Sequence, residues 1–145
     1  MYDSMLIPTD GSEAANRAVD HGADLAAVHD ASVCLLYVVD ATSFSGMGTE
    51  TVGSDPIGAA TGEGEDVVQA AAERIADRGI DISTAVEQGV PDETILRYIR
   101  DEAFDIVVMG THGRSGIQRY LEGSVTEQVV RSSAAPVLTL TDSAQ

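Results

Sequence analysis

The sequence contains no lysine, and this absence excludes one common way of holding a phosphate. A Walker loop requires Gly-x-x-x-x-Gly-Lys followed by Ser or Thr, so this chain cannot form one. The Gly-x-Gly-x-x-Gly fingerprint of dinucleotide-binding proteins is missing as well. If the chain binds a phosphate, it must use a different arrangement of glycines.

Basic charge is scarce throughout the chain. Eight arginines stand against 24 carboxylates, which gives a formal net charge of −16. Such a surface repels nucleic acid and anionic lipid, so we expect neither as a partner. The same charge destabilises a compact fold by self-repulsion unless salt screens it. An acid-rich chain without lysine therefore predicts a salt-loving source.

Cysteine and long apolar runs are also scarce. Cys34 is the only cysteine, so no intramolecular disulfide can form, as is typical of a reducing compartment. Its apolar neighbours predict a small buried hydrophobe rather than a reactive thiol. No apolar run approaches the ~20 residues that span a bilayer, and residues 1–4 lack the basic charge of a signal peptide. We expect a cytoplasmic protein without membrane contact.

Short apolar runs alternate with amphipathic segments along the whole chain, which predicts a single domain over residues 1–145. The expected strands are 4–8, 31–39, 81–87, 105–109 and 136–140, and the expected helices are 15–26, 63–79, 91–99 and 125–131. This alternation predicts an α/β fold with a doubly wound, open parallel sheet of five strands. The pattern alone leaves the order of the strands open.

The segment 40–64 is rich in glycine and has no hydrophobic periodicity. A loop of this length is usually functional or disordered, so it is expected to be a flexible loop, either a flap beside a site or plain disorder. Residues 141–145 are expected to form a polar tail.

Two strand exits are unusually rich in turn residues. Pro8-Thr9-Asp10-Gly11 follows the first strand, and a glycine-rich stretch from Gly110 follows the fourth. Glycine-rich backbone between a strand and a helix leaves N–H groups available to an anion, usually a phosphate. In an open parallel sheet, ligands bind beyond the carboxyl ends of the strands. The two exits therefore predict a nucleotide site.

The second exit has a specific spacing. Gly110-x-x-Gly113 is followed by nine residues and then by Gly123-Ser124, directly after an Ile-Val-Val strand. This pattern resembles the ATP-binding branch of the universal stress protein family. Segments 6–12, 36–40 and 135–138 are similar to further signatures of the family, so the resemblance covers essentially the whole chain. It implies a Rossmann-like sheet with strand order 3-2-1-4-5 and a switch point between the first and fourth strands.

The resemblance also implies a set of contacts with ATP. The backbone of Val38 would hold the adenine edge, and Asp10 with the backbone near Thr9 would contact the adenosine. Arg114 is the one cation in the glycine-rich stretch 109–116, which makes it the candidate for a side chain facing the phosphates. The residues expected at the site are Pro8, Thr9, Asp10, Val38, Met109, Gly110, Gly113, Arg114, Gly123, Ser124 and Val125.

Several of these residues have simpler explanations. Asp10 with Glu13 also fits a helix-capping arrangement. Ser124 with Glu127 is a capping box, which is compatible with a phosphate contact. The glycines could serve only a tight turn, and Arg114 could be a solvated loop residue.

No protein-built metal site is expected, because His21 and His29 lack a third ligand. Since phosphates bring negative charge into an acidic protein, we expect Mg²⁺ or Mn²⁺ to accompany ATP. The cation would be held mainly by phosphate oxygens and water, and Asp10 could reach it through water.

The motifs assemble no catalytic residues: His112 has no evident nucleophile or carboxylate partner. We therefore expect an ATP-binding stress-response regulator that acts through conformation or partners. A slow ATP hydrolase and a nucleotide-free dimeric scaffold are the alternatives. The resemblance implies a homodimer through the final strand, 136–140, although a short edge strand can equally be capped in a monomer.

Overall fold

A computed structural model describes residues 2–40, 56–111 and 123–141 of the chain. Its centre is a five-stranded sheet in the order β3-β2-β1-β4-β5, and every pair of neighbouring strands is parallel. The strands are β1 (Ser4–Pro8), β2 (Ser32–Asp40), β3 (Ile82–Gly89), β4 (Ile106–Thr111) and β5 (Val137–Thr141). The expected fold class and strand order are both confirmed.

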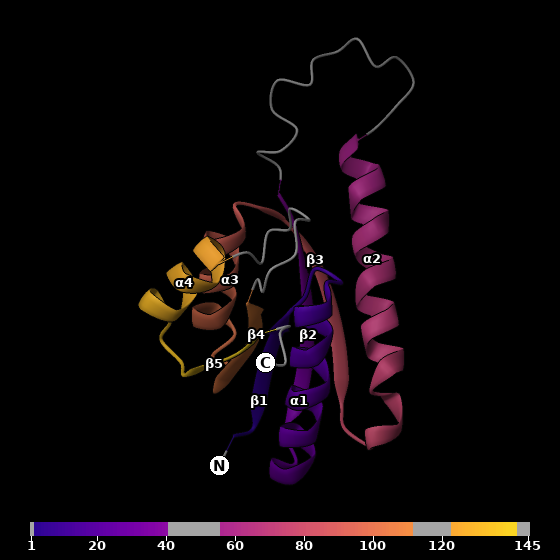
Figure 1. Cartoon of the computed structure of the whole chain (residues 1–145), viewed down its shortest axis with the longest axis vertical. Helices are drawn as coiled ribbons and strands as arrows, with labels where there is room; N and C mark the ends of the chain where they lie inside the picture. Colours follow the sequence, from indigo (N-terminus) through magenta and orange to yellow (C-terminus); the bar gives the residue numbers. More distant parts are fainter. Residues whose placement is uncertain (1, 41–55, 112–122, 142–145) are drawn as a thin grey trace.

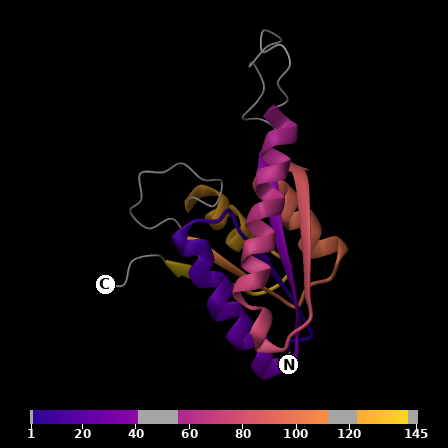
Figure 2. The same ribbon diagram turned by 90° about the vertical axis from the view of Figure 1, so that its right-hand side faces the viewer.

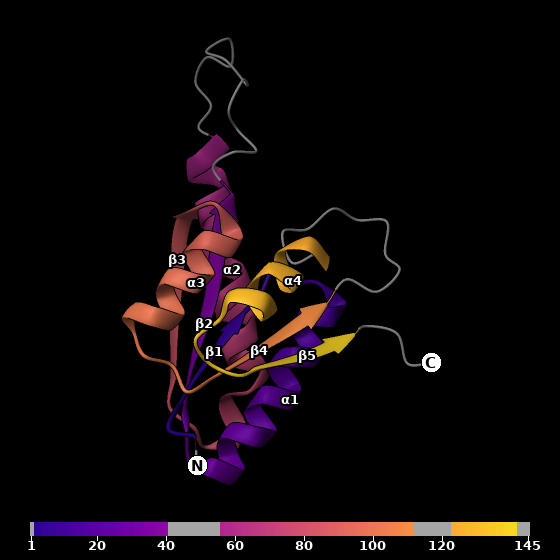
Figure 3. The same ribbon diagram turned by 90° about the vertical axis from the view of Figure 1, so that its left-hand side faces the viewer.

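Helices cover both faces of the sheet. Helices α1 (Glu13–His29) and α2 (Pro56–Arg74) lie on one face (Figure 2), and α3 (Pro91–Asp101) and α4 (Gly123–Ser132) lie on the other (Figure 3). Side chains alternate across a strand, so Met5 and Ile7 pack under α1 and α2 while Leu6 packs under α3 and α4. The two hydrophobic clusters on either side of the sheet hold these layers together.

Helix α1 packs very close to the sheet because its buried face consists of small residues. At Gly22 a Cβ atom would lie 2.7 Å from Ile7 Cδ1, so only glycine fits there without repacking. The helix is capped by Ser12, whose side chain accepts a hydrogen bond from the Ala15 N–H at 3.2 Å. These local features bring the start of α1 directly over the carboxyl end of the sheet.

The prediction of a loop over 40–64 is wrong for residues 56–64, which are helical, and for Asp40, which ends β2. Helix α2 begins at Pro56, whose fixed φ suits the first helical position; residues 41–55 lie outside the described part of the chain. The misleading signal was glycine: a Cβ at Gly64 would collide with the ring of Tyr37, so this glycine serves close packing on β2. Glu63, Glu65 and Asp66 consequently lie in the middle of α2 and not in its first turn.

The carboxyl end of α2 is also earlier than expected. The helix stops at Arg74, a short 3₁₀ helix η2 (Ala76–Arg78) follows, and Gly79 closes that segment with a left-handed φ of 73°. The other strand and helix boundaries lie within three residues of the expected ones.

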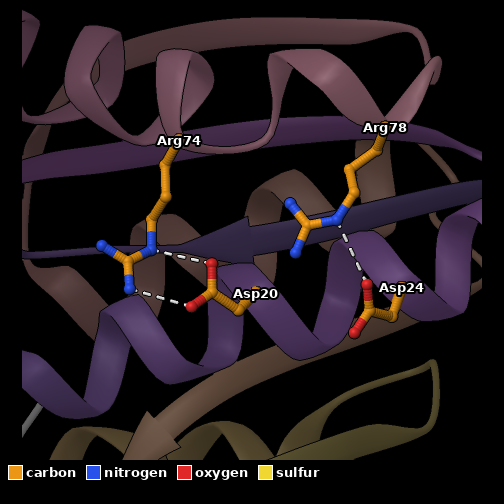
Figure 4. Close-up of polar contacts among 4 residues, drawn as sticks. All are labelled: Asp20, Asp24, Arg74 and Arg78. Atoms are coloured by element: carbon orange, nitrogen blue, oxygen red, sulfur yellow. Dashed lines mark hydrogen bonds and ion pairs between the residues drawn. The ribbon is translucent and has the colours of Figure 1, made fainter.

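Two ion pairs join α2 and η2 to α1 (Figure 4). The Arg74 guanidinium donates to both carboxylate oxygens of Asp20 at 2.7 and 2.8 Å, and Arg78 Nε lies 3.2 Å from Asp24 Oδ1. The hydrogen bond from Arg74 lowers the pKa of Asp20. Because these side chains are partly solvated, each pair stabilises the fold by no more than about 1 kcal/mol. Their role is to fix how α2 lies beside α1.

No helix within residues 2–40, 56–111 and 123–141 has both the length and the apolar content required of a membrane span.

Candidate functional site

The carboxyl ends of β1 and β4 lie next to each other in the sheet. From β1 the chain turns into α1 on one face, and after β4 it continues to α4 on the other face (Figures 1 and 3). This is the topological switch point of an open α/β sheet, where the chain leaves a crevice for a ligand.

The turn between β1 and α1 is buried and internally braced. Thr9 is fully buried and Asp10 is 3% exposed. The Thr9 N–H donates to the Leu36 carbonyl at 2.8 Å, and Asp10 Oδ1 accepts from the Ser12 N–H at 2.9 Å. Gly11 adopts φ +81°, a conformation that favours glycine. The turn thus holds a buried carboxylate directly after the carboxyl end of β1.

The helix-capping explanation for Asp10 is wrong. Ser12 is the N-cap of α1, and Asp10 instead braces the turn two residues earlier, as Asp commonly does. Because Ser12 is the N-cap of α1, helix capping does not explain why an aspartate occupies position 10.

Gly110 is the point at which three elements meet. A Cβ there would collide with the backbone carbonyl of Ala14 and lie 2.7 Å from the Ala15 nitrogen, so glycine lets the first turn of α1 rest on β4. On the other side, the buried Thr126 hydroxyl donates to the Gly110 carbonyl at 3.3 Å and ties α4 to the same strand end. The structure therefore gives Gly110 a packing role that the sequence pattern did not reveal.

Thr126 is a positioning residue that sequence reasoning missed. Its only signal in the sequence is a hydroxyl residue two positions after Ser124, on the buried face of a short helix. Without the fold, this signal cannot be told from an ordinary first-turn threonine.

Two expected site residues can offer only their backbone. The side chains of Val38 and Met109 are 1% and 0% exposed and belong to the hydrophobic cluster under α3 and α4. The Leu36 carbonyl points toward β1, where it accepts from Thr9, and alternate residues of a strand direct their polar groups to the same side. The N–H and C=O of Val38 therefore point beyond Pro8, where β1 ends.

The amino terminus of α4 supplies further donors. The helix begins at Gly123, so the N–H groups of its first turn have no acceptor within the helix and carry the positive end of its dipole. Val125 is half-buried against the cluster under α3 and α4. Gly113, Arg114 and His112 lie outside the described residues.

The profile of the universal stress protein family matches residues 1–140 of the chain. The chain belongs to this family. Universal stress protein MJ0531 of Methanocaldococcus jannaschii is 33% identical to it over 138 residues, which cover 95% of this chain and 81% of that protein.

Solved structures of the universal stress protein family share the fold. That of protein MJ0577 from the same organism superimposes with a TM-score of 0.83 at 29% identity and covers 100% of this chain and 99% of its own. A universal stress protein in complex with cAMP gives a TM-score of 0.72 at 24% identity, with 98% of both chains covered, a likeness that shows the fold.

Two of the three histidines, His21 and His29, lie within the residues that the structure describes. Within the described ranges no group of three or more His, Cys, Asp and Glu side chains could hold a metal ion. His29 is instead a structural residue: its Nδ1 accepts from the Tyr2 N–H at 3.4 Å, and the two rings lie 5.0 Å apart.

Cys34 lies on the margin of the hydrophobic cluster under α3 and is only half-buried. Burial raises the pKa of its thiol, and a hydrogen bond with Ser83 partly opposes this shift. Because the thiolate is the reactive form, the raised pKa is consistent with the expected structural role.

Proposed function

We propose that this chain is a cytoplasmic stress-response regulator that holds ATP at the carboxyl ends of β1 and β4 and acts through conformation or a partner. The observation that carries this proposal is the meeting of β4, α1 and α4 at Gly110. It brings the buried turn that contains Asp10 and the amino-terminal part of α4 to the same end of the sheet.

The proposed site assigns each part of an adenine nucleotide to a different segment at this end of the sheet. The backbone of Val38 faces the side where an adenine edge would lie, and Asp10 with Thr9 lies where the adenosine would follow. The first turn of α4, from Gly123 to Val125, would receive the phosphates. A relative of the same fold was solved in complex with cAMP, an adenine nucleotide, which supports this class of ligand. The sequence spacing adds Gly113 and Arg114 to the phosphate contacts.

A divalent cation is part of the proposal. The triphosphate brings several negative charges into a chain of net charge −16, and Mg²⁺ or Mn²⁺ would offset them. Since the described residues provide no chelating cluster, phosphate oxygens and water would hold the cation, with Asp10 as the carboxylate of the crevice.

The test is to purify the protein in molar KCl, denature it and chromatograph any released nucleotide. ATP–Mg²⁺ is then titrated into the stripped protein by calorimetry, with ATP plus EDTA as the matched control. We expect adenine nucleotide in the released fraction and weaker binding with EDTA. If the refolded wild type neither carries nor binds a nucleotide, the proposal fails and the scaffold alternative stands. Phosphate release in the same samples detects a slow hydrolase.

We further propose that the chain forms a homodimer through β5, which is an edge strand. The Val107 N–H donates to the Pro136 carbonyl at 2.9 Å, so the backbone of Leu138 faces β4 and that of Thr139 faces outward. Thr139→Pro removes an outward N–H and leaves the β4 pairing intact. We expect sedimentation in molar KCl to show a dimer for the wild type and 15.1 kDa for the variant. A wild-type mass of 15.1 kDa would refute the dimer.

The acidic surface is proposed to be an adaptation to high salt. The Debye length falls from about 10 Å at 0.1 M to about 3 Å at 1 M salt, so added KCl should relieve the self-repulsion of a chain with net charge −16. We expect the melting temperature to rise between these concentrations. A melting temperature independent of KCl would contradict the adaptation.

A further inference from the structure

A groove of about 300 Å³ runs between α1 and α2 on the face shown in Figure 2, and it has no part in the proposed nucleotide contacts. Its lining from α2 includes Val67, Ala70 and Ala71, and Gly11 contributes backbone from the β1–α1 turn. On the opposite side, Asn16 lines the groove from the first turn of α1. We name this feature the α1–α2 groove.

One end of the α1–α2 groove is closed by the ion pair between Arg74 and Asp20 (Figure 4). The second pair joins Arg78 of η2 to Asp24, one turn further along α1. Two consecutive links fix the spacing of the helices at this end. Arg74, which lines the groove, thus also helps to fix its shape.

The mouth of the α1–α2 groove is negatively charged. Glu63 and Asp66 lie one turn apart on α2, are exposed and line the groove. Among the described residues neither takes part in a salt bridge, whereas the charge of Arg74 is already matched by Asp20. An apolar floor beneath two carboxylates is complementary to an apolar side chain with basic neighbours.

The α1–α2 groove adjoins the proposed nucleotide site. Gly11 directly follows Asp10, and a Cβ at Gly11 would lie only 3.4 Å from Val67 Cγ2. Gly11 and Val67 thus lie close together in the lining of the groove. A displacement of this turn on ligand binding must change the contact with Val67.

We infer that the α1–α2 groove is the docking site for a basic partner segment that inserts one apolar side chain, and that nucleotide binding at the adjoining turn changes its affinity. The proposal of docking is based on the shape and charge of the groove alone. The coupling rests on the proposed function, because it requires a nucleotide at the turn that contains Asp10.

The probe for docking is the tripeptide N-acetyl-Arg-Leu-Arg-amide, titrated into ¹⁵N-labelled protein at 0.1 M and 1 M KCl. We expect saturable shifts of the Val67, Ala70 and Ala71 amides, weaker at high salt because the charges are screened. The matched peptide with Ser in place of Leu should bind about tenfold more weakly, since it buries no apolar side chain. Equal binding of both peptides, or no saturable shifts with either, would overturn insertion into the groove.

The matched protein variants are Ala70→Glu and Ala59→Glu. Both positions are exposed on α2, but only Ala70 lines the groove. We expect Ala70→Glu to lose at least about tenfold in peptide affinity while Ala59→Glu binds as wild type, with melting curves showing that both fold. Unchanged binding by Ala70→Glu overturns the docking site. So does a change of its sedimentation mass, because the groove would then be a contact between copies of the chain.

The charge and the coupling are tested separately. Glu63→Gln combined with Asp66→Asn should remove the salt dependence of peptide binding, and Glu65→Gln combined with Asp77→Asn, outside the groove, should preserve it.

Saturating ATP–Mg²⁺ should change peptide affinity by about threefold or more, with a reciprocal change for ATP. Unchanged peptide affinity with ATP demonstrably bound overturns the coupling. Failure of ATP to bind refutes the proposed function and leaves the docking result standing.

Discussion

Replacing Gly110 with alanine is expected to lower the free energy of unfolding by about 3 kcal/mol, at the upper end of the usual cost of overpacking. The added methyl group would collide with the carbonyl of Ala14 and crowd the Ala15 nitrogen. Both contacts are backbone atoms in the first turn of α1, so no rotamer change can relieve them. The measurement is urea unfolding in molar KCl.

Gly62→Ala is the matched control for this prediction. Gly62 lies in α2, and a Cβ there would meet nothing within 4 Å. Alanine should therefore stabilise the protein by up to about 1 kcal/mol through helix propensity alone. If Gly110→Ala unfolds at the same urea concentration as wild type, the close approach of α1 to β4 is wrong.

Replacing Asp10 with asparagine is expected to lower the affinity for ATP–Mg²⁺ by about tenfold, the loss typical when a carboxylate that supports a bound cation is removed. The side-chain oxygen of asparagine can still accept from the Ser12 N–H, so the turn keeps its brace. The substitution removes the negative charge. Calorimetric titrations with and without Mg²⁺ measure the effect.

The change in ATP affinity without Mg²⁺ shows whether Asp10 acts through its charge or through the structure of its turn. With EDTA present, Asp10→Asn should bind ATP no more weakly than wild type, because one carboxylate fewer repels the phosphates. Ser12→Ala is the control: it removes the α1 cap and costs about 1 kcal/mol of stability but leaves the charge of Asp10. An unchanged dependence on Mg²⁺ in Asp10→Asn would contradict a role for Asp10 near the cation.

Local signals in the sequence were sufficient for most of the elements. The bounds of β1 were predicted at 4–8 as observed, and Pro91 begins α3 as its fixed φ indicates. The start of α2 was missed because glycine was taken as a loop signal. Gly64 is glycine because Tyr37, 27 positions earlier, packs against its backbone. A contact of this kind leaves no trace in local periodicity.

The sequence by itself determined that alternating strands and helices build an open α/β sheet, and that two turn-rich strand exits end at the same edge. Only the tertiary structure showed that Gly110 is required by the backbone of Ala14, and that Asp20 and Arg74 join α1 to α2. Hydrophobic periodicity states which face of an element is buried, but not which distant residue covers it. Close approaches and grooves between elements depend on which distant residue covers a buried face. Only the packing of the folded chain decides this.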